Sequence, residues 1–489
     1  MTMPEHPPHI IRRQFVEIDL HGAESDGMAL QRRLPDLCNR LVTPVLDRAL
    51  ARCDPHDGWV VVERLDVDLG RMSPDALERD LPEAIGRAVE SFFRDHPPPP
   101  EQPAETGNVK HRSDRDTADD ALITFLRTGR LPWSFRLPPG RHLEEVLLTA
   151  WTAADGATRP SPSPARRAAL LDVLAVAGAR RRLSRQFSPA FLKSLLRLLS
   201  ETGAATMDIC LRWLQDLDRT VPAGEMLLAQ LWETAFAGIS SGALPSPRQI
   251  LVEAWRAVPP DTRGHGQVRT LLARVVPDLF DHAEPQAKPS MTASDSPHAD
   301  AGHEPRRPDR TRLLPIEPTV ANGEGIDGVY VDNAGVVLLH PFLPRCFEAL
   351  GIAEGGRLPQ PERALCLLHY LATGELSAPE YELVLAKVLC DVAIDESLRA
   401  VTLSDSESAE AITLLEAAIR HWAALRGTGP DGLRSTFLMR PGMLTADDDG
   451  GWLLRVESQA FDILLDQLPW GISMIQLPWM QRLLRVEWR

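Results

Sequence analysis

The sequence predicts a multi-domain α+β protein that is predominantly helical. Its 489 residues correspond to about three domains, at about 150 residues for each. Proline contributes 42 of the 489 residues, about 9% against a usual value of about 5%, and prolines gather in two polar stretches. Apolar residues recur mostly at helical spacing, with period-two stretches near both ends of the chain. We therefore expect compact modules joined by proline-rich connectors.

The two polar stretches set the module boundaries. Residues 97–117 and 282–325 are rich in proline and lack apolar periodicity, so they cannot bury enough apolar surface to offset chain entropy. They are expected to be linkers. The remaining chain divides into an N-terminal module at 1–96, a helical module at 118–281 and a C-terminal module at 326–489.

The N-terminal module is predicted to be β-α-β-α. Val16, Ile18 and Leu20 alternate with acidic residues, as in a half-buried strand, and residues 60–69 repeat the pattern. Apolar residues between Leu30 and Val45 follow helical spacing, and Ser73 begins a second helix. Two strands joined by a helical crossover would be parallel. Because two strands make a thin sheet, we expect a further strand from this chain or from a partner.

The helical module is predicted to contain helices of 12 to 18 residues separated by proline and glycine. One helix starts at Ser188-Pro189, and others cover Gly224–Ile239 and Arg248–Val258. Short connections favour antiparallel helix pairs. No fixed repeat period is visible.

The C-terminal module is predicted to be mixed, with two hairpins. The first is expected at residues 329–339, around Asn333-Ala-Gly335, and the second joins 437–444 to 452–456 through an Asp-Gly turn. Between them, helices are predicted at Pro361–Thr373, Tyr381–Val392 and Glu407–Leu425.

An internal echo links the helical and C-terminal modules. Phe125-Leu-Arg-Thr-Gly129-Arg-Leu131 matches Tyr370-Leu-Ala-Thr-Gly374-Glu-Leu376. Both strings predict a helix that ends on a glycine with positive φ. A shared way of ending a helix explains this internal echo better than duplication of a functional element does.

Charge and cysteine usage limit the classes of partner. The net charge is −15, which disfavours nucleic acid and anionic membrane surfaces. The six cysteines are scattered and form no CxxC pair, which is typical of reduced, buried thiols. The chain shows no signal-peptide pattern and no apolar run of 18 residues. We therefore expect a cytoplasmic protein.

Residues that could carry chemistry are few. No phosphate-binding glycine loop, HExxH or GxSxG motif is present. Cys366 and His369 share a helical spacing suited to a metal, and an acidic run at 447–449 could hold a cation, but apolar flanks and a hairpin tip explain them more simply. His340, Asp66 and Asp68 likewise have structural explanations. The sequence thus predicts no cofactor, no metal and no enzyme.

Tryptophan motifs are the most distinctive feature. Leu-Pro-Trp occurs at Leu468-Pro469-Trp470 and Leu477-Pro478-Trp479, with a third copy at Leu131-Pro132-Trp133, and Trp488 lies near the end of the chain. Tryptophan is enriched at interface hot spots, so these residues are candidates for docking. The alternative is that they form the core of the C-terminal module. The alternating residues 484–488 are expected to form an edge strand open to a partner.

At this point the sequence resembles the tape measure protein family of contractile injection systems, which are phage-tail-like particles. The N-terminal strings are His9-Ile-Ile-Arg-Arg-Gln14, Val16-Glu-Ile-Asp-Leu20 and Glu63-Arg-Leu-Asp-Val-Asp-Leu-Gly70. The central string is Phe125-Leu-x-Thr-Gly-x-Leu-Pro-Trp133. The C-terminal strings are Val331-Asp-Asn-Ala-Gly-Val-Val-Leu-Leu-His-Pro-Phe342, His369-Tyr-Leu-Ala-Thr-Gly374, His421-Trp422, Leu465-Asp-Gln-Leu-Pro-Trp470 and Ile475-Gln-Leu-Pro-Trp479.

The resemblance implies a non-enzymatic assembly factor that sets or templates the length of the inner tube and sheath. It implies inner tube, baseplate and tube-terminator proteins as partners, together with an AAA ATPase of the same system. Even an entirely helical chain would span only roughly 730 Å, at about 1.5 Å per residue. The chain therefore extends in the particle, acts in several copies, or serves instead as a baseplate or tube-nucleation scaffold.

Overall fold

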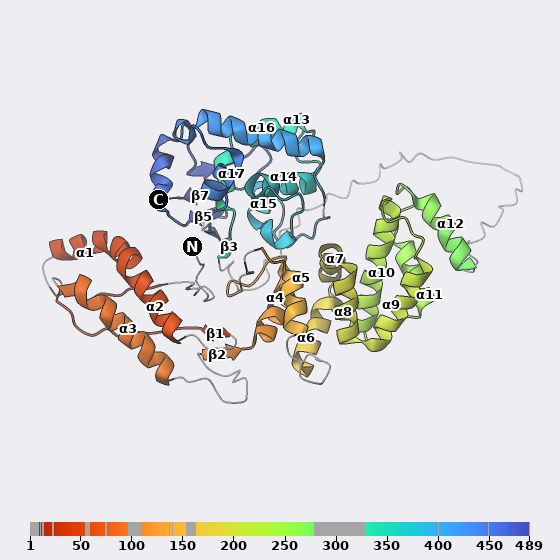
Figure 1. The fold of residues 1–489 in the computed structure, drawn as a ribbon, viewed down its shortest axis with the longest axis horizontal. Helices are drawn as coiled ribbons and strands as arrows, with labels where there is room; N and C mark the ends of the chain where they lie inside the picture. The colour runs from red at the N-terminus through yellow and green to blue at the C-terminus, as the bar shows by residue number, and fades with distance from the viewer. Residues whose placement is uncertain are drawn as a thin grey trace, which may run out of the picture. The chain divides into compact units, whose positions relative to one another are not determined.

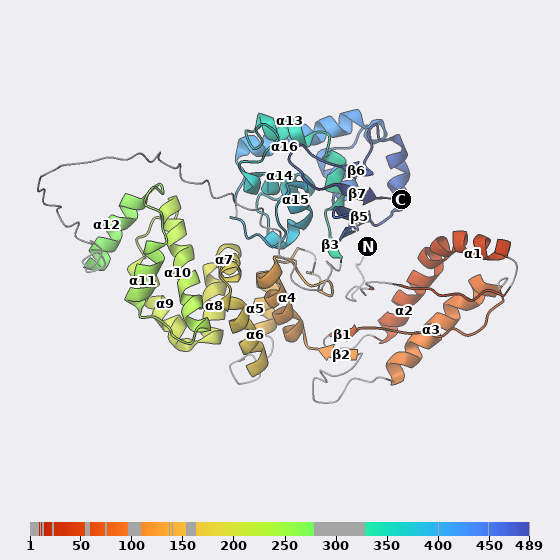
Figure 2. The same cartoon turned by 180° about the vertical axis from the view of Figure 1, so that it is seen from behind.

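The fold is described from a computed structural model, and Figures 1 and 2 show it from two sides. It describes residues 9–277 and 328–488, apart from gaps at 10, 12–13, 22–23, 54–58, 74–75, 96–108, 136, 139, 153–162, 400 and 448. The linker predicted at 282–325 and most of the one at 97–117 lie outside the described residues. The predominantly helical α+β class is confirmed.

The chain forms two compact units. The first comprises Met1–Leu183, Phe187–Phe191 and Ile394–Ser397. The second comprises Ser184–Gln186, Leu192–Ala393 and Leu398–Arg489. Each unit contains more than one of the predicted modules, which are described separately below.

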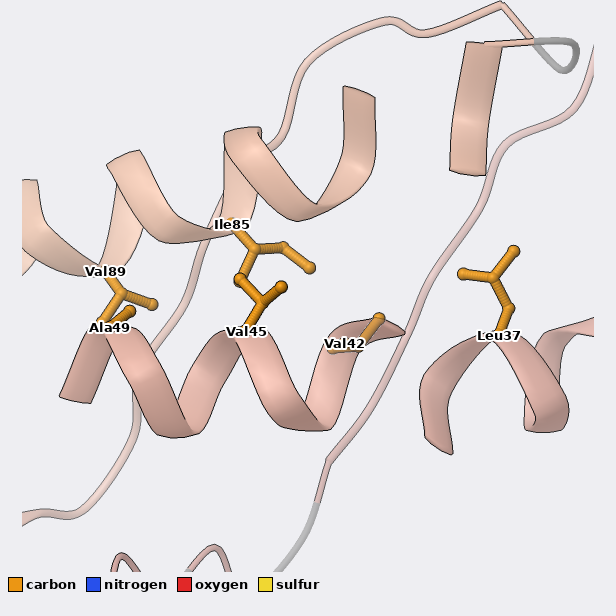
Figure 3. Close-up of a cluster of buried hydrophobic side chains, with 6 residues drawn as sticks. All are labelled: Leu37, Val42, Val45, Ala49, Ile85 and Val89. Carbon is orange, nitrogen blue, oxygen red and sulfur yellow. The ribbon is translucent and has the colours of Figure 1, made fainter. Parts of the chain in front are cut away.

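Three helices make the core of the N-terminal module. They are α1 (Glu24–Leu37), which continues into the π-helical turn η1 (Cys38–Val42), then α2 (Thr43–Cys53) and α3 (Leu77–Asp95). Figure 3 shows Val45 and Ala49 of α2 meeting Ile85 and Val89 of α3. Burial of this apolar stripe holds the helices together, because it removes about 25 cal/mol of unfavourable hydration for each Å² covered.

The strands of this module differ from the prediction. β1 (Trp59–Val62) pairs antiparallel with β2 (Val109–Arg112), so the further strand comes from this chain. The expected parallel pair is not found among the described residues. Residues 14–20 form neither helix nor strand, and residues 64–69 place Leu65 and Leu69 against the core.

The helical part of the first unit begins after β2. Its helices are α4 (Asp114–Thr128), α5 (Leu143–Thr152), α6 (Pro164–Ala175) and α7 (Ala177–Gln186), of which the last three residues belong to the second unit. Ser113 caps α4 by accepting the Asp116 N–H, and Ser163 caps α6 in the same way. The aromatic rings of Phe125, Phe187, Phe191 and Trp151 pack in the interior.

Short helices continue in the second unit. They are α8 (Pro189–Leu199), which spans the unit boundary, α9 (Glu201–Trp213), α10 (Pro222–Ser240), α11 (Pro247–Arg256) and α12 (His265–Val275). Figures 1 and 2 both place α9, α10 and α11 side by side. Gly238 permits the turn into α11, because a Cβ there would meet Pro245 at 2.4 Å.

A five-stranded sheet organises the C-terminal module. Its order is β3-β4-β5-β7-β6, and only the β5–β7 pair is parallel. The strands are β3 (Val329–Val331), β4 (Gly442–Ala446), β5 (Trp452–Val456), β6 (Met474–Ile475) and β7 (Leu484–Glu487). The hairpin predicted around the Asp-Gly turn is present as β4–β5, but its first strand begins at Gly442 and not at 437, because residues 434–438 form a helical turn.

The rest of the module is largely helical. The α-helices are α13 (Leu343–Ala349), α14 (Pro361–Thr373), α15 (Val384–Leu389), α16 (Asp405–His421) and α17 (Pro430–Leu433). Shorter helical turns are η4 (Ala334–Leu339), η5 (Glu380–Glu382), η6 (Ala423–Leu425), η7 (Arg434–Leu438) and η8 (Ala460–Gln467). No described helix is both long enough and apolar enough to cross a membrane.

The hairpin predicted at residues 329–339 is wrong. β3 pairs with β4 instead, and the apolar run that follows it is the buried turn η4. A fully buried apolar run does not reveal its period, which explains the error. Gly335 is required here, since a Cβ would lie 1.7 Å from the carbonyl oxygen of Phe437.

The predicted edge strand at 484–488 is also wrong. β7 lies inside the sheet, parallel to β5 on one side and antiparallel to β6 on the other. Its alternation reflects burial of Leu484 and Val486 on one face, with Arg485 and Glu487 exposed on the other. Its hydrogen-bonding groups are therefore used within the module.

Candidate functional site in the C-terminal module

The two C-terminal Leu-Pro-Trp copies flank β6 and turn back onto the helices of their own module. Trp479 is buried, and its ring stacks on Phe347 with 5.2 Å between centroids. Its Nε1–H donates to the carbonyl oxygen of Leu389 at 2.8 Å. Leu389 is the last residue of α15, where helix carbonyls lack intrahelical partners. Trp479 thus caps the C-terminal end of α15.

Trp470 makes an equivalent contact nearer the surface. Its Nε1–H donates to the carbonyl oxygen of Leu338, in the last turn of η4, at 3.0 Å. Its ring meets Phe342 edge-on at 5.2 Å. Trp470 is half-buried, whereas Pro469 is exposed. Removing either indole N–H would leave a carbonyl unpaired, at a cost of about 1–3 kcal/mol.

Trp488 joins a buried ionic network that the sequence analysis missed. Arg440 donates to both carboxylate oxygens of Asp462, at 2.8 and 3.0 Å, and Trp488 Nε1–H donates to Asp462 Oδ2 at 3.2 Å. The guanidinium also lies over the rings of Phe461 and Trp488, at 5.1 and 5.4 Å. One indication of this network is visible in the sequence. A single arginine lies within the apolar run 437–444, and a buried charge needs a partner.

Asp462 is ionised because of these contacts. Burial alone would raise the pKa of its carboxyl group. Hydrogen bonds from Arg440, the Gln459 N–H and Trp488, with the Arg440 charge, outweigh burial and hold the pKa of Asp462 below its usual range. The carboxylate also caps η8 through the Gln459 N–H.

The upstream copy, Leu131-Pro132-Trp133, belongs to the first unit. All three residues are half-buried in a turn that follows α4, and the Phe135 N–H donates to the Pro132 carbonyl at 3.0 Å. The structure therefore brings together Leu468, Pro469, Trp470, Leu477, Pro478, Trp479 and Trp488 in the C-terminal module, whereas the upstream copy belongs to the other unit.

The internal echo has the same construction in both copies. Gly129 ends α4 with φ of 74°, and Gly374 ends α14 with φ of 82°, which confirms the predicted glycine caps. Thr128 and Thr373 each donate a hydroxyl to the carbonyl four residues earlier, at 2.7 and 2.9 Å.

At each of these helix ends a buried arginine donates hydrogen bonds to the backbone. Arg182 donates to the Leu126 carbonyl, and its guanidinium lies 6.0 Å from the Phe125 ring centroid. Arg434 donates to the carbonyls of Tyr370 and Leu371 at 3.2 and 3.3 Å, and lies 5.2 Å from the ring of Tyr370. Neither arginine was identified from sequence.

The candidate chemical residues have structural contacts. Cys366 donates to the carbonyl of Val401 at 3.0 Å, and burial raises the pKa of its thiol. Buried His369 bonds to Glu382 at 2.8 Å. No group of three potential metal ligands is found in the described parts of the chain.

Other candidates also lie in structural pairs. Asp447 and Asp449 lie 3.4 and 3.6 Å from the guanidinium of Arg485, and Asp66 pairs with Arg64. His340 bonds to the Val337 carbonyl at 3.0 Å, while burial lowers the pKa of its imidazole.

Apolar side chains are exposed in the segment 461–474, which contains the first C-terminal Leu-Pro-Trp copy. Ile463 in η8 is 61% exposed and Met474 at the start of β6 is 68% exposed. Phe461 is partly exposed as well. We call Phe461, Ile463, Leu468, Pro469, Trp470 and Met474 the C-terminal apolar surface.

Substitution of Asp462 tests the buried network. Asp462→Asn leaves the Arg440 charge without its carboxylate, so we expect it to lower the free energy of unfolding at pH 7 by about 3–5 kcal/mol. A folded pKa below the unfolded value of about 3.9 stabilises at higher pH, and this contribution disappears as pH falls through the folded pKa. The difference from wild type should therefore shrink below about pH 4.

Urea unfolding monitored at several pH values measures this effect. Asp431→Asn is the matched control, because Asp431 pairs with Arg434 but is 94% exposed, and we expect a change of at most about 1 kcal/mol. An Asp462→Asn deficit that persists unchanged at pH 3 would contradict an ionised Asp462 as its source.

Comparison with known proteins identifies the family. The family model described as contractile injection system tape measure protein matches residues 8–488. No curated protein and no solved structure matches the chain. Because the match covers nearly the whole chain, including the folded modules and the tryptophan motifs, the chain belongs to the contractile injection system tape measure protein family.

Proposed function

We propose that this chain sets particle length as a non-enzymatic component, with its C-terminal module as the docking end and the helical region α4–α12 as the spacer. A length-determining structural role is that of its family. These two roles are assigned from the different architectures of the two parts. The C-terminal module is a mixed fold whose sheet includes its own C-terminal strand, whereas α4–α12 is a run of successive short helices.

The form of the helices restricts how length is set. The longest described helices, α3 and α10, have 19 residues, which corresponds to about 28 Å at 1.5 Å per residue. A single continuous helix is therefore not the spacer within the described residues. Each helix pair of the spacer instead adds one short step, and the full length requires several copies of the chain or extension of it.

A non-enzymatic role is supported by the way polar groups are used. Cys366, His369 and Asp462 are each engaged in contacts that hold the C-terminal module together. Their replacement would first disturb packing, as expected for residues of a structural protein.

The proposed partners are the inner tube, baseplate and tube-terminator proteins of the same system, together with its AAA ATPase. Family membership implies association with other components of the particle. The C-terminal apolar surface is the docking candidate, because one short segment carries several exposed apolar side chains and a half-buried tryptophan, and such residues are typical of interface anchors. Leu131-Pro132-Trp133 is a second candidate in the first unit.

Deletion of one helix pair tests the spacer. Removal of residues 246–276, which contain α11 and α12, should shorten the most frequent particle length measured by negative-stain electron microscopy. Removal of 31 residues from the 283–313 segment is the control, and it should leave the length unchanged. Equal lengths for the helix deletion and wild type would contradict the spacer, and would favour a baseplate or tube-nucleation scaffold.

A surface substitution tests docking separately from folding. Ile463→Asp places a charge on the C-terminal apolar surface, so we expect about tenfold fewer particles or more, with the melting temperature unchanged. Val176→Asp is the matched control, since Val176 is 60% exposed in the helical region and aspartate is compatible with its position before α7. Normal assembly with Ile463→Asp would remove this surface as the docking site.

A further inference from the structure

An exposed segment that is neither helix nor strand precedes α1 in the N-terminal module. In Gln14–Leu20, Val16, Ile18 and Leu20 alternate with Glu17 and Asp19, the period of a β-strand. Phe15 is 82% exposed, and Val16 and Ile18 are also exposed. The side chains of residues 14–19 are left exposed by their own module, so a partner is expected to cover them.

Contacts at both ends hold the segment in place. Before it, His9 Nδ1 lies 2.8 Å from Asp47 Oδ1 in α2. After the exposed stretch, Leu20 packs against α1, where a Cβ at Gly27 would lie 3.8 Å from Leu20 Cδ2. These anchors reduce the conformational entropy that the segment would lose on binding.

The backbone of the segment is available for pairing. No hydrogen bond joins residues 14–20 to any other described residue, whereas residues 59–62 pair with β2. Unpaired N–H and C=O groups along an extended chain are a template for strand addition. Both the alternating sequence and the unpaired backbone of this segment therefore favour pairing with a strand.

Charge selects the kind of strand that would pair. Glu17 and Asp19 lie on one side of the segment, and the second extended stretch of the module, 64–69, turns Asp66 and Asp68 outward while Leu65 and Leu69 contact the core. Pairing with a second copy of this chain in the register that aligns the apolar residues would place carboxylates opposite carboxylates, which is unfavourable. Lysine or arginine at those positions would be favourable.

We propose that Gln14–Leu20 is a docking strand that adds to the sheet edge of another protein whose edge strand presents Lys or Arg at alternate positions. Exposed sheet edges commonly carry such basic residues. The main-chain hydrogen bonds supply the affinity and the alternating charges supply the register. The inference rests on the N-terminal module alone and does not depend on docking by the C-terminal apolar surface.

Peptide binding to the full chain tests this proposal. The probe is a fluorescent ten-residue peptide in which Lys and Val alternate, and the controls are the Glu–Val peptide and a peptide of five Lys followed by five Val. Anisotropy should show that the alternating Lys peptide binds about tenfold or more tightly than either control, with affinity falling as salt rises. Hydrogen exchange should slow at residues 14–20.

A matched pair of variants separates strand pairing from charge attraction. Ile18→Pro removes a backbone donor from an exposed position, so it should weaken binding of the alternating Lys peptide about tenfold or more without changing the melting temperature. Ile18→Thr keeps both the donor and a β-branched side chain, so it should bind nearly as the wild type does.

Several results would overturn the proposal. These are equal binding of the block and alternating Lys peptides, undiminished binding by Ile18→Pro, and exchange protection confined to other residues. Sedimentation that shows self-association, with residues 14–20 protected in the absence of peptide, would assign the strand to a second copy and would also overturn it.

Discussion

The C-terminal module depends on the buried contact among Arg440, Asp462 and Trp488. Arg440 precedes β4, Asp462 lies in η8, and Trp488 follows β7, so one carboxylate joins three parts of the chain that are separate in sequence. A buried ion pair adds little net stability compared with an apolar pair of the same shape. Its consequence is specificity, because any arrangement that separates the partners leaves a buried charge unpaired.

This specificity fixes the path of the C-terminal segment. With Trp488 held beside Asp462, β7 enters the sheet between β5 and β6, and the two Leu-Pro-Trp copies reach the ends of η4 and α15. Proline suits these turns because it fixes φ and requires no hydrogen-bond acceptor. The tryptophan that follows each proline supplies a donor to a helix end. The last part of the chain therefore completes the module from within.

Local patterns in the sequence predict much of this fold. The helix Pro361–Thr373, the β4–β5 hairpin and the glycine caps at Gly129 and Gly374 depend on residues close together in the chain, and all are confirmed. The failures at 329–339 and 484–488 concern runs whose partners lie about one hundred and about thirty residues away. Local periodicity contains no information on such partners.

The candidate site shows the same limit. Tryptophan content drew attention to Trp470, Trp479 and Trp488, but not to Arg440 or Asp462, because a buried ion pair between distant residues leaves only a lone charge in an apolar run. The structure also separates two roles that sequence could not distinguish. Trp479 and Trp488 are buried in the module, whereas Trp470 is only half-buried.

For a tape measure protein, a prefolded end offers a fixed point from which a spacer can act. The most direct measurement is hydrogen exchange of the full chain, read by mass spectrometry in β7 and in α14. If the C-terminal segment closes the module, the amides of Leu484–Glu487 will exchange as slowly as those in the middle of Pro361–Thr373. Rapid exchange in β7 while α14 stays protected would show a detachable docking tail and would contradict this view of the fold.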